Sequence, residues 1–328
     1  MLVLSRSDLK QLVSMRDAVE LMKVAFRELS AGQAASPLRT AIDVGETGGT
    51  TLLMPAYVPA QSALGVKVVS VFSGNRDRGL PTIHALVCLV DAETGVPTAI
   101  MDGGYLTALR TGAVSGAATD LLARHDSHVV VVVGAGAQGV TQAVAVATVR
   151  PIERIIAVDV TEEQLARYRE AMARDWPEFA GIVETTTAAA VVGEADVICT
   201  ATTSCKPVFD DRDVRLGTHI NAVGAFTPKM QELPPGTVAR ATIVVDSTEA
   251  VLAEAGDLII PLEQGLIDRS RLTRELGMLV AGEVTGRVDD QEITLFKSVG
   301  NAVQDVVVAR RAAVQASTLG LGTIVDLG

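Results

Sequence analysis

The sequence predicts an α/β protein with a Rossmann-type, doubly wound parallel sheet and a second, discontinuous α+β domain. Three observations support this fold class. A glycine-rich turn follows five consecutive valines at 129–133, strand-like and helix-like segments alternate after residue 124, and strand-like segments without long helices between them begin at residue 39. Strand–helix alternation builds a parallel sheet through right-handed crossovers. Consecutive strands favour an antiparallel or mixed sheet instead.

The composition argues against several classes of protein. The 328 residues carry a formal net charge of −11, whereas a nucleic-acid partner needs a basic face. No apolar run approaches the ~20 residues of a membrane span, and residues 1–12 turn polar too early for a signal peptide. Cys88, Cys199 and Cys205 form no disulfide or zinc pattern. We therefore expect a cytoplasmic protein without a metal, membrane or nucleic-acid partner.

The first hundred residues are expected to form one helix and several strands. Residues 1–30 predict a short strand and a helix capped by Ser14, because apolar residues recur there with a period of 3.6. Turn sequences rich in Gly and Asp then separate strand-like segments. These segments are 51–58, 63–72, 83–91 and 96–102.

The remaining chain alternates between strands and helices. A long helix rich in small residues is expected from Tyr105 to Arg124. A last helix, at about 295–317, is apolar along one face and is expected to return to the first domain, which makes that domain discontinuous. Strands are expected between these helices, within 129–133, 154–160, 191–203, 216–224 and 240–247.

The strongest local motif is the glycine turn that contains Gly134, Gly136 and Gly139. In a dinucleotide-binding turn the first glycine permits the tight turn, the second lets the backbone approach a pyrophosphate, and the third lets helix and strand pack closely. The following helix offers free N–H groups and the positive end of its dipole to an anion. The alternative is a tight turn without a ligand.

Asp159 ends the next strand, 20 residues after the third glycine. Its carboxylate would accept hydrogen bonds from the ribose hydroxyls of an adenosine, and it would repel a 2′-phosphate. Val160 and Thr161 supply no cation to reverse this preference. NAD(H) is therefore favoured, with NADP(H) as the alternative, unless Asp159 is an ordinary acid at the end of a strand.

Three cations stand in apolar or strand-like surroundings, where a charge is costly unless it has a partner. Lys67 lies within a predicted strand, Arg39 precedes the strand-rich region, and Arg110 lies on a helix face of small residues. Because Arg offers a paired fork and Lys a point charge, they suit a small-molecule carboxylate. Structural ion pairs and snorkelling side chains are the alternatives. His84, on a strand, is either a core or interface group or a proton donor.

An ordered series of sequence blocks resembles the ornithine cyclodeaminase/mu-crystallin family. The resemblance implies a homodimer that forms through the strand-rich N-terminal domain. It implies a substrate and dimerisation domain at 1–118 with 303–328 and an NAD(P)-binding Rossmann domain at 119–302. The blocks are PLRT at 37–40, GVKVVS at 65–70, GLPT at 79–82, DAETGVPTAIMDG at 91–103, LRTGAVSG at 109–116, VGAGAQG at 133–139, VGAFTPKMQEL at 223–233, VVDSTEAVLAEAGDL at 244–258 and TLFKSVGNAVQD at 294–305.

The resemblance also implies roles for individual residues. Arg39, Lys67 and Arg110 would hold a substrate carboxylate, and Lys67 and Arg110 would act in catalysis. Apart from the resemblance, His84 or an ordered water is our candidate for the proton donor. The glycine turn and Asp159 would bind the cofactor together with Thr82, Arg110, Ala137, Gln138, Thr200, Val223, Gly224, Ala225 and Ser298, while Phe226 and Val299 would contact the substrate.

Phe226 is a departure from part of the family. The cyclodeaminases and alanine dehydrogenases carry an Asp for proton transfer at this position, whereas members that reduce cyclic ketimines do not. Oxidative deamination needs a base, but reduction of a preformed imine needs only a carboxylate clamp, a hydride and one proton. We therefore expect NAD(P)H-dependent reduction of Δ1-pyrroline-2-carboxylate to L-proline, or of Δ1-piperideine-2-carboxylate to L-pipecolate. The alternatives are an ornithine cyclodeaminase, an alanine-type dehydrogenase, and a mu-crystallin-like NAD(P)H-binding protein.

Overall fold

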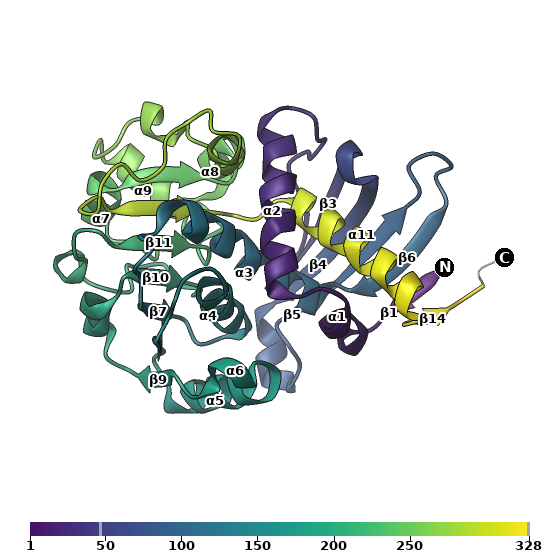
Figure 1. The fold of residues 1–328 in the computed structure, drawn as a ribbon, viewed down its shortest axis with the longest axis horizontal. Helices are drawn as coiled ribbons and strands as arrows, with labels where there is room; N and C mark the ends of the chain where they lie inside the picture. Colours follow the sequence, from purple (N-terminus) through teal and green to yellow (C-terminus); the bar gives the residue numbers. More distant parts are fainter. Residues whose placement is uncertain (46–47, 327–328) are drawn as a thin grey trace. The chain divides into compact units, whose positions relative to one another are not determined.

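The computed structural model describes residues 1–45 and 48–326, which fall into two compact units (Figure 1). Unit 1 comprises the described residues of Met1–Arg110 and Asn301–Gly328, and unit 2 comprises Thr111–Gly300. The first boundary lies inside one continuous helix, α3 (Gly103–Leu122). The sequence analysis places the boundaries at 118/119 and 302/303 instead. An uninterrupted helix carries no local signal for the point at which its contacts change from one unit to the other.

Among the described residues, the strands of unit 1 form one mixed sheet of seven strands, in the order β14-β1-β6-β5-β4-β3-β2. Neighbouring strands are antiparallel except β1 and β6, which are parallel. This agrees with the predicted antiparallel or mixed sheet, although β2 and β14 were not anticipated. The strands are β1 (Leu2–Leu4), β2 (Thr40–Val44), β3 (Gly49–Val58), β4 (Ala63–Phe72), β5 (Ile83–Val90), β6 (Pro97–Asp102) and β14 (Thr323–Ile324).

Helices α1 (Arg6–Leu12), α2 (Met15–Ser30) and α11 (Ala302–Leu319) belong to unit 1. Ser14 caps α2 as predicted, because its hydroxyl accepts the N–H of Asp17 at 3.1 Å. Helix α11, yellow in Figure 1, packs against α2, β3, β4 and β5. The last helix therefore returns to the first strands of the chain, as expected, and its buried face completes their hydrophobic core.

The start of the last helix was predicted wrongly. Residues Thr294–Lys297 form a strand, β13, in which all four residues are buried between β11 and β12. Gly300 then turns the chain with a φ of 83°, and Asn301 caps α11. A short apolar run gives the same signal for a buried strand as for a buried helix. Its place in the sheet depends on strands that are distant in the sequence.

Unit 2 is built on a parallel sheet whose order is β12-β13-β11-β10-β7-β8-β9. Every pair of neighbouring strands in it is parallel, which confirms the predicted Rossmann-type sheet. The strand order reverses between β7 and β10, and ligands of such sheets bind at the carboxyl ends of the strands beside that point. The strands are β7 (Val129–Val133), β8 (Arg154–Val158), β9 (Val183–Thr186), β10 (Val197–Thr200), β11 (His219–Ala222), β12 (Thr242–Val245) and β13.

Helices separate the strands of unit 2 and cover its hydrophobic core. They are α4 (Ala137–Val149), α5 (Glu162–Asp175), α6 (Pro177–Ala180), α7 (Pro235–Arg240), α8 (Thr248–Glu254), α9 (Gly256–Glu263) and α10 (Leu276–Val280). Short 3₁₀ turns occur at η1 (Pro59–Gln61) and η2 (Ser73–Arg78) in unit 1, and at η3 (Ala189–Glu194), η4 (Asp211–Asp213) and η5 (Arg269–Leu272) in unit 2.

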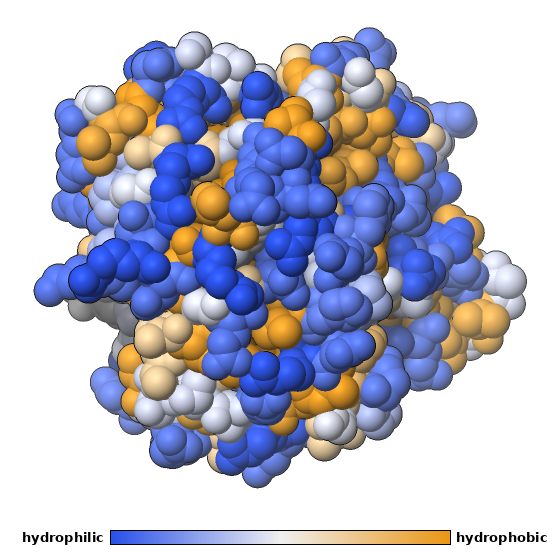
Figure 2. Space-filling view, turned by 60° about the vertical axis from the view of Figure 1, so that its left-hand side comes forward, coloured by the Kyte–Doolittle hydropathy of each residue, from blue (hydrophilic) through white to orange (hydrophobic). Residues whose placement is uncertain are grey.

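The face drawn in Figure 2 is mainly polar. Figure 2 shows hydrophilic residues over most of the face that it draws, with hydrophobic residues gathered in small groups between them. Within 1–45 and 48–326, no helix combines the length and the apolar character that a membrane span requires.

Candidate active site

The glycine turn follows β7, and each of its glycines has a separate structural reason. Gly134 has a φ of 103°, and a Cβ there would lie 2.6 Å from the carbonyl oxygen of Ala201. A Cβ on Gly139 would collide with the carbonyl oxygen of Gly134. Beside Gly136 the space is open among the described atoms. The turn is therefore closed at its first and third glycines and accessible at its second, as a pyrophosphate site requires.

The amino end of α4 can bind an anion. Its N-cap is Gly136, which has no side chain that could accept the first N–H groups of the helix. The side-chain oxygen of Gln138, in the same turn, is buried and has no hydrogen-bond partner among the described residues. Ala137, at the first helical position, is exposed. These features fit a dinucleotide whose diphosphate lies against this turn.

Asp159 follows β8 and is linked to the glycine turn. Its Oδ2 accepts the N–H of Ala135 at 2.9 Å, and its Oδ1 accepts the N–H of Val160 at 2.8 Å. Val160 is 92% exposed. The acid is therefore held where β8 ends, beside the turn, with no cation supplied by the next residue.

The other predicted residues of unit 2 gather at the same edge of its sheet. Because the strands are parallel, the residues that end or follow β7, β8, β10, β11 and β13 share one edge. Val299 is buried, and Phe226 is half-buried against the hydrophobic core of unit 2. The structure thus brings together Gly134, Gly136, Ala137, Gln138, Gly139, Asp159, Thr200, Val223, Gly224, Ala225, Phe226, Ser298 and Val299.

Asp246 is a residue of this edge that the sequence analysis missed. Its Oδ2 accepts the Ser298 hydroxyl at 2.6 Å and the N–H groups of Val299 and Gly300 at 2.9 and 3.0 Å. The carboxylate is fully buried at the end of β12, and burial raises its pKa. Its position directly after the apolar strand segment Thr242–Val245 is the sequence feature by which it could have been predicted. Asp246 holds the segment that follows β13 in place.

In unit 1, two of the predicted cations share one buried carboxylate. Lys67 Nζ lies 2.7 Å from Asp305 Oδ2, and Arg110 Nε lies 3.1 Å from Asp305 Oδ1. Arg110 Nη1 also donates to the side-chain oxygen of Gln304 at 2.6 Å. Lys67, Arg110 and Asp305 are 1%, 5% and 0% exposed. The sequence analysis named both cations but not Asp305 or Gln304, which lie in the first turn of α11.

This cluster carries more positive than negative charge. Burial, together with the charges of Arg110 and Arg39, lowers the pKa of Lys67 to about 7, and Asp305 opposes this shift. Arg39 is half-buried rather than buried, because it lies in the segment before β2 and not within a packed element. Two buried cations face only one carboxylate, so one positive charge is not balanced. A second anion would balance it and relieve the repulsion between Lys67 and Arg110.

His84 is not brought to this cluster. It is exposed on β5 and pairs with Ser70 of β4. Because side chains alternate along a strand, Ser70 and Lys67 point to opposite faces of the sheet, and His84 shares the face of Ser70. Thr82 precedes β5 and accepts the N–H of Phe72 through its carbonyl oxygen at 2.8 Å. Unit 1 therefore gives no support to His84 as a proton donor beside Lys67.

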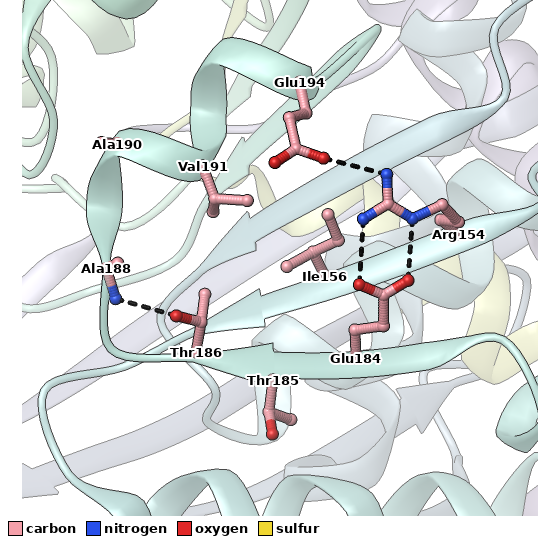
Figure 3. A pocket seen from close by; sticks show the side chains of 9 residues that line it. All are labelled: Arg154, Ile156, Glu184, Thr185, Thr186, Ala188, Ala190, Val191 and Glu194. Carbon is pink, nitrogen blue, oxygen red and sulfur yellow. Dashed lines mark hydrogen bonds and ion pairs between the residues drawn. The ribbon is translucent and has the colours of Figure 1, made fainter.

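A cavity of about 430 Å³ lies elsewhere in unit 2, against β8, β9 and η3 (Figure 3). Arg154 stands between Glu184 and Glu194, whose carboxylates it contacts at 2.7 and 2.9 Å. These ion pairs satisfy the only charged side chains among its nine lining residues. None of the nine is a predicted site residue. The lining residues are Arg154, Ile156, Glu184, Thr185, Thr186, Ala188, Ala190, Val191 and Glu194.

Comparison with known proteins identifies the family. A model of the ornithine cyclodeaminase/mu-crystallin family matches residues 1–318. The chain belongs to this family. A Delta(1)-pyrroline-2-carboxylate reductase of Bacillus cereus is 40% identical over 327 residues, which cover 99% of this chain and 100% of that protein. The resemblance inferred from the sequence blocks is thereby confirmed.

Two solved structures are similar to this fold along its whole length. One is the Delta(1)-pyrroline-2-carboxylate reductase of Thermococcus litoralis in complex with NADH and L-proline. It has a TM-score of 0.94 and 43% identity, and the match covers 99% of this chain and 100% of that one. The other is an archaeal alanine dehydrogenase dimer with bound NAD, with a TM-score of 0.91 and 35% identity over 100% of this chain and 99% of that one.

Proposed function

We propose that this protein is an NADH-dependent reductase that converts Δ1-pyrroline-2-carboxylate to L-proline. The observation that carries the proposal is the buried cluster of Lys67, Arg110 and Asp305, in which two cations share one carboxylate. Such a cluster favours the carboxylate of a small substrate. The similarity to reductases of this name, one of them described with NADH and L-proline, supports the same substrate and product.

The cofactor would be held by unit 2. The glycine turn and the amino end of α4 would bind the diphosphate, and Asp159 would accept hydrogen bonds from the adenosine ribose. When bound, NADH supplies the hydride that reduces the imine. Asp159 favours NADH over NADPH, and the relatives described with NADH or NAD agree with that preference.

The substrate carboxylate would be held by Arg110 and Lys67, with Arg39 adding positive charge. Holding the carboxylate fixes the position of the imine carbon next to it. Lys67 has a pKa of about 7, so its ammonium can also release a proton near neutral pH, which suits a catalytic role. Phe226 supplies no carboxylate for deprotonating an ammonium group. Reduction of a preformed imine is therefore favoured over oxidation of a free amino acid.

We also propose that the protein forms a homodimer through its strand-rich substrate domain, 1–118 with 303–328. Unit 1 exposes large apolar side chains on β2 and β5 and in the segments before them, and β2 is exposed along its whole length. These side chains are Leu38, Ile42, Val44, Leu80, Ile83 and Leu86. Exposed apolar groups of this kind mark association surfaces. Light scattering on the purified protein tests the dimer.

A cytoplasmic location is part of the same proposal. Cys88, Cys199 and Cys205 are all free thiols, and free thiols are typical of a reducing compartment. The activity would then depend on a cellular supply of reduced nicotinamide. Fractionation of the source cells would test the location.

A steady-state assay tests the activity. Δ1-Pyrroline-2-carboxylate and its six-membered homologue are each supplied with NADH and with NADPH, and reduction of the five-membered imine with NADH should be fastest. Release of ammonia from ornithine, or oxidation of alanine at a comparable rate, would contradict the proposal in favour of the deaminating enzymes. Tight NADH binding without turnover of either imine would instead indicate a cofactor-binding protein.

A further inference from the structure

One buried carboxylate joins two loops at the carboxyl edge of the unit 2 sheet. Glu232 Oε2 accepts the Thr200 hydroxyl at 2.9 Å and the N–H groups of Gly224 and Ala225 at 2.8 and 3.1 Å. Its Oε1 accepts the N–H of Thr202 at 2.6 Å. Thr200 is the last residue of β10 and Thr202 lies in the loop after it, while Gly224 and Ala225 lie in the loop after β11. Glu232 therefore sets the spacing between these loops.

Gly224 is adapted to this close arrangement. A Cβ on Gly224 would collide with the Glu232 carboxylate and with the carbonyl oxygen of Thr202. The position therefore requires glycine because of its neighbours, although its φ is not in the left-handed region. Because the carboxylate and both loops are in direct contact, a substitution of Glu232 would displace the backbone of both loops.

A second buried acid holds Glu232 in turn. Asp257 Oδ1 accepts the N–H groups of Glu232 and Leu233 at 2.6 and 2.9 Å, and Asp257 Oδ2 lies 2.8 Å from Lys297 Nζ. Glu232, Asp257 and Lys297 are each 0% exposed. Lys297 is the last residue of β13, next to Ser298. The network thus connects the ends of β10, β11 and β13.

The donors around Glu232 favour its ionised form. The Thr200 hydroxyl and the N–H groups of Thr202, Gly224 and Ala225 all donate to the carboxylate, so an added proton on it would face donors rather than acceptors. Burial and the charge of Asp257 raise the pKa of Glu232, while Lys297 and the donors act in the opposite direction. Buried charges contribute little net stability compared with apolar packing. The presence of these buried charges is therefore better explained by the geometry that they impose on the loops than by a gain in stability.

We propose that Glu232 is a positioning residue for the dinucleotide. It touches neither substrate nor reacting atoms but holds residues 200–202, at the end of β10, and residues 223–225, after β11, at the spacing that the bound cofactor requires. The inference rests on the proposed function, which assigns these loops to the cofactor. Asp257 supports Glu232 by accepting the N–H groups of Glu232 and Leu233, and Lys297 supports Asp257 in turn.

The experiment compares two carboxylates of unit 2. Glu232→Gln keeps the shape of the side chain but turns an N–H₂ group toward one set of donors. Glu292→Gln is the matched control, because Glu292 also joins elements, accepting the N–H of Val288 at 2.7 Å and the Thr242 hydroxyl, but at the amino ends of β12 and β13. The free enzymes are titrated with NADH by its fluorescence, and folding is checked by circular dichroism and thermal melting.

The expected result is a rise of about tenfold in the Kd for NADH in Glu232→Gln, since small displacements of positioned groups have effects of this order or larger. The KM for NADH should rise with it, whereas the KM for the imine at saturating NADH should change less than twofold. Glu292→Gln should bind NADH like the wild type. Glu232→Asp keeps the charge but is too short to reach both loops, so its Kd should also rise.

The outcomes that would overturn the positioning role differ in whether they also overturn the proposed function. A folded Glu232→Gln variant with the wild-type Kd for NADH overturns the positioning role and leaves the proposed function intact. If Glu232→Gln does not fold, a wild-type Kd in Glu232→Asp has the same consequence. A wild-type protein that binds no NADH overturns the proposed function and this inference together. An equal loss of affinity in Glu292→Gln would show a general structural effect and would also overturn it.

Discussion

Lys67 and Asp305 form a buried ion pair in unit 1, with 2.7 Å between Nζ and Oδ2. Lys67 lies in the middle of β4 and Asp305 in the first turn of α11, so the pair joins an early strand to the last helix. Arg110 shares the same carboxylate. Removing one member of such a buried pair typically costs about 3–5 kcal/mol, because the remaining charge is left without a partner.

The affinity for a carboxylate ligand should fall as the pH rises through about 7. Burial lowers the pKa of Lys67 to about 7, so the ammonium that attracts the carboxylate is lost above that pH. L-Proline suits the measurement, because neither its carboxylate nor its amine titrates between about pH 5 and 9. Its Kd, measured by calorimetry with saturating NADH, should rise across this range. Lys67→Arg should remove the pH dependence because a guanidinium stays charged.

The stability of the ligand-free protein should rise with pH, whereas the affinity for the carboxylate ligand falls. Because the pKa of Lys67 is lowered in the folded state from its ordinary value of 10.5, the unfolded chain binds more protons between about pH 7 and 10. The free energy of unfolding should therefore increase as the pH rises through this range, so that this group destabilises the folded protein less at high pH. Urea unfolding of the wild type and of Lys67→Met at pH 7 and 9 measures it. A difference between the two proteins that does not change with pH would contradict the lowered pKa.

Removing either cation should weaken the binding of substrate. A charge-assisted hydrogen bond to a buried carboxylate contributes about 1.5–3 kcal/mol, so Lys67→Ala and Arg110→Ala should lower kcat/KM by about ten- to hundredfold. Most of the loss should appear as a higher KM for the imine. Lys206→Ala is the control, since Lys206 is exposed in unit 2. Unchanged kinetics in a folded Lys67→Ala variant would exclude Lys67 from the carboxylate site.

Cofactor preference should follow the charge at the end of β8. Asp159→Ser combined with Val160→Arg removes an anion and adds a cation where a 2′-phosphate would lie, so the double variant should shift kcat/KM toward NADPH. The exposed position of Val160 tolerates an arginine. Val160→Arg alone should shift the preference less, because Asp159 remains. If the wild type already prefers NADPH strongly, the role assigned to Asp159 is wrong.

Phe226 should favour reduction over deamination. The wild type should reduce Δ1-pyrroline-2-carboxylate far faster than it oxidises proline, alanine or ornithine, because no carboxylate occupies this position. Phe226→Asp should slow the reduction, since it adds charge and water. It should also lower the melting temperature, because the half-buried ring packs on the core of unit 2. Initial rates in both directions and a thermal melt provide the measurements. Rapid ammonia release from ornithine by the wild type would contradict the prediction whatever the variant does.

Much of the fold and of the cofactor site could be predicted because the relevant information is local. The valines before Gly134, the spacing of the three glycines and the acid 20 residues later lie within one strand–turn–helix–strand unit, and the backbone geometry of that unit depends mainly on those residues. Lys67 and Arg110 could be named for a similar reason: a charge within an apolar segment is unusual wherever the segment folds. Strand β13 could not be recognised, because four buried residues, Thr294–Lys297, are too few to show a strand or helix period of their own.

Only the tertiary structure decided what the charged residues contact. Arg110 meets Asp305 across 195 residues of sequence, and this happens because α11 returns to the sheet of unit 1. Glu232 reaches Thr200 across 32 residues, because the ends of parallel strands meet at a common edge of the sheet. The sequence by itself pointed to Lys67 and Arg110 as charges in apolar surroundings, whereas the buried acids Asp246, Glu232 and Asp305 became evident only in the structure. Their partners were set by packing, because an ion pair forms between whichever groups the fold brings within a few ångströms.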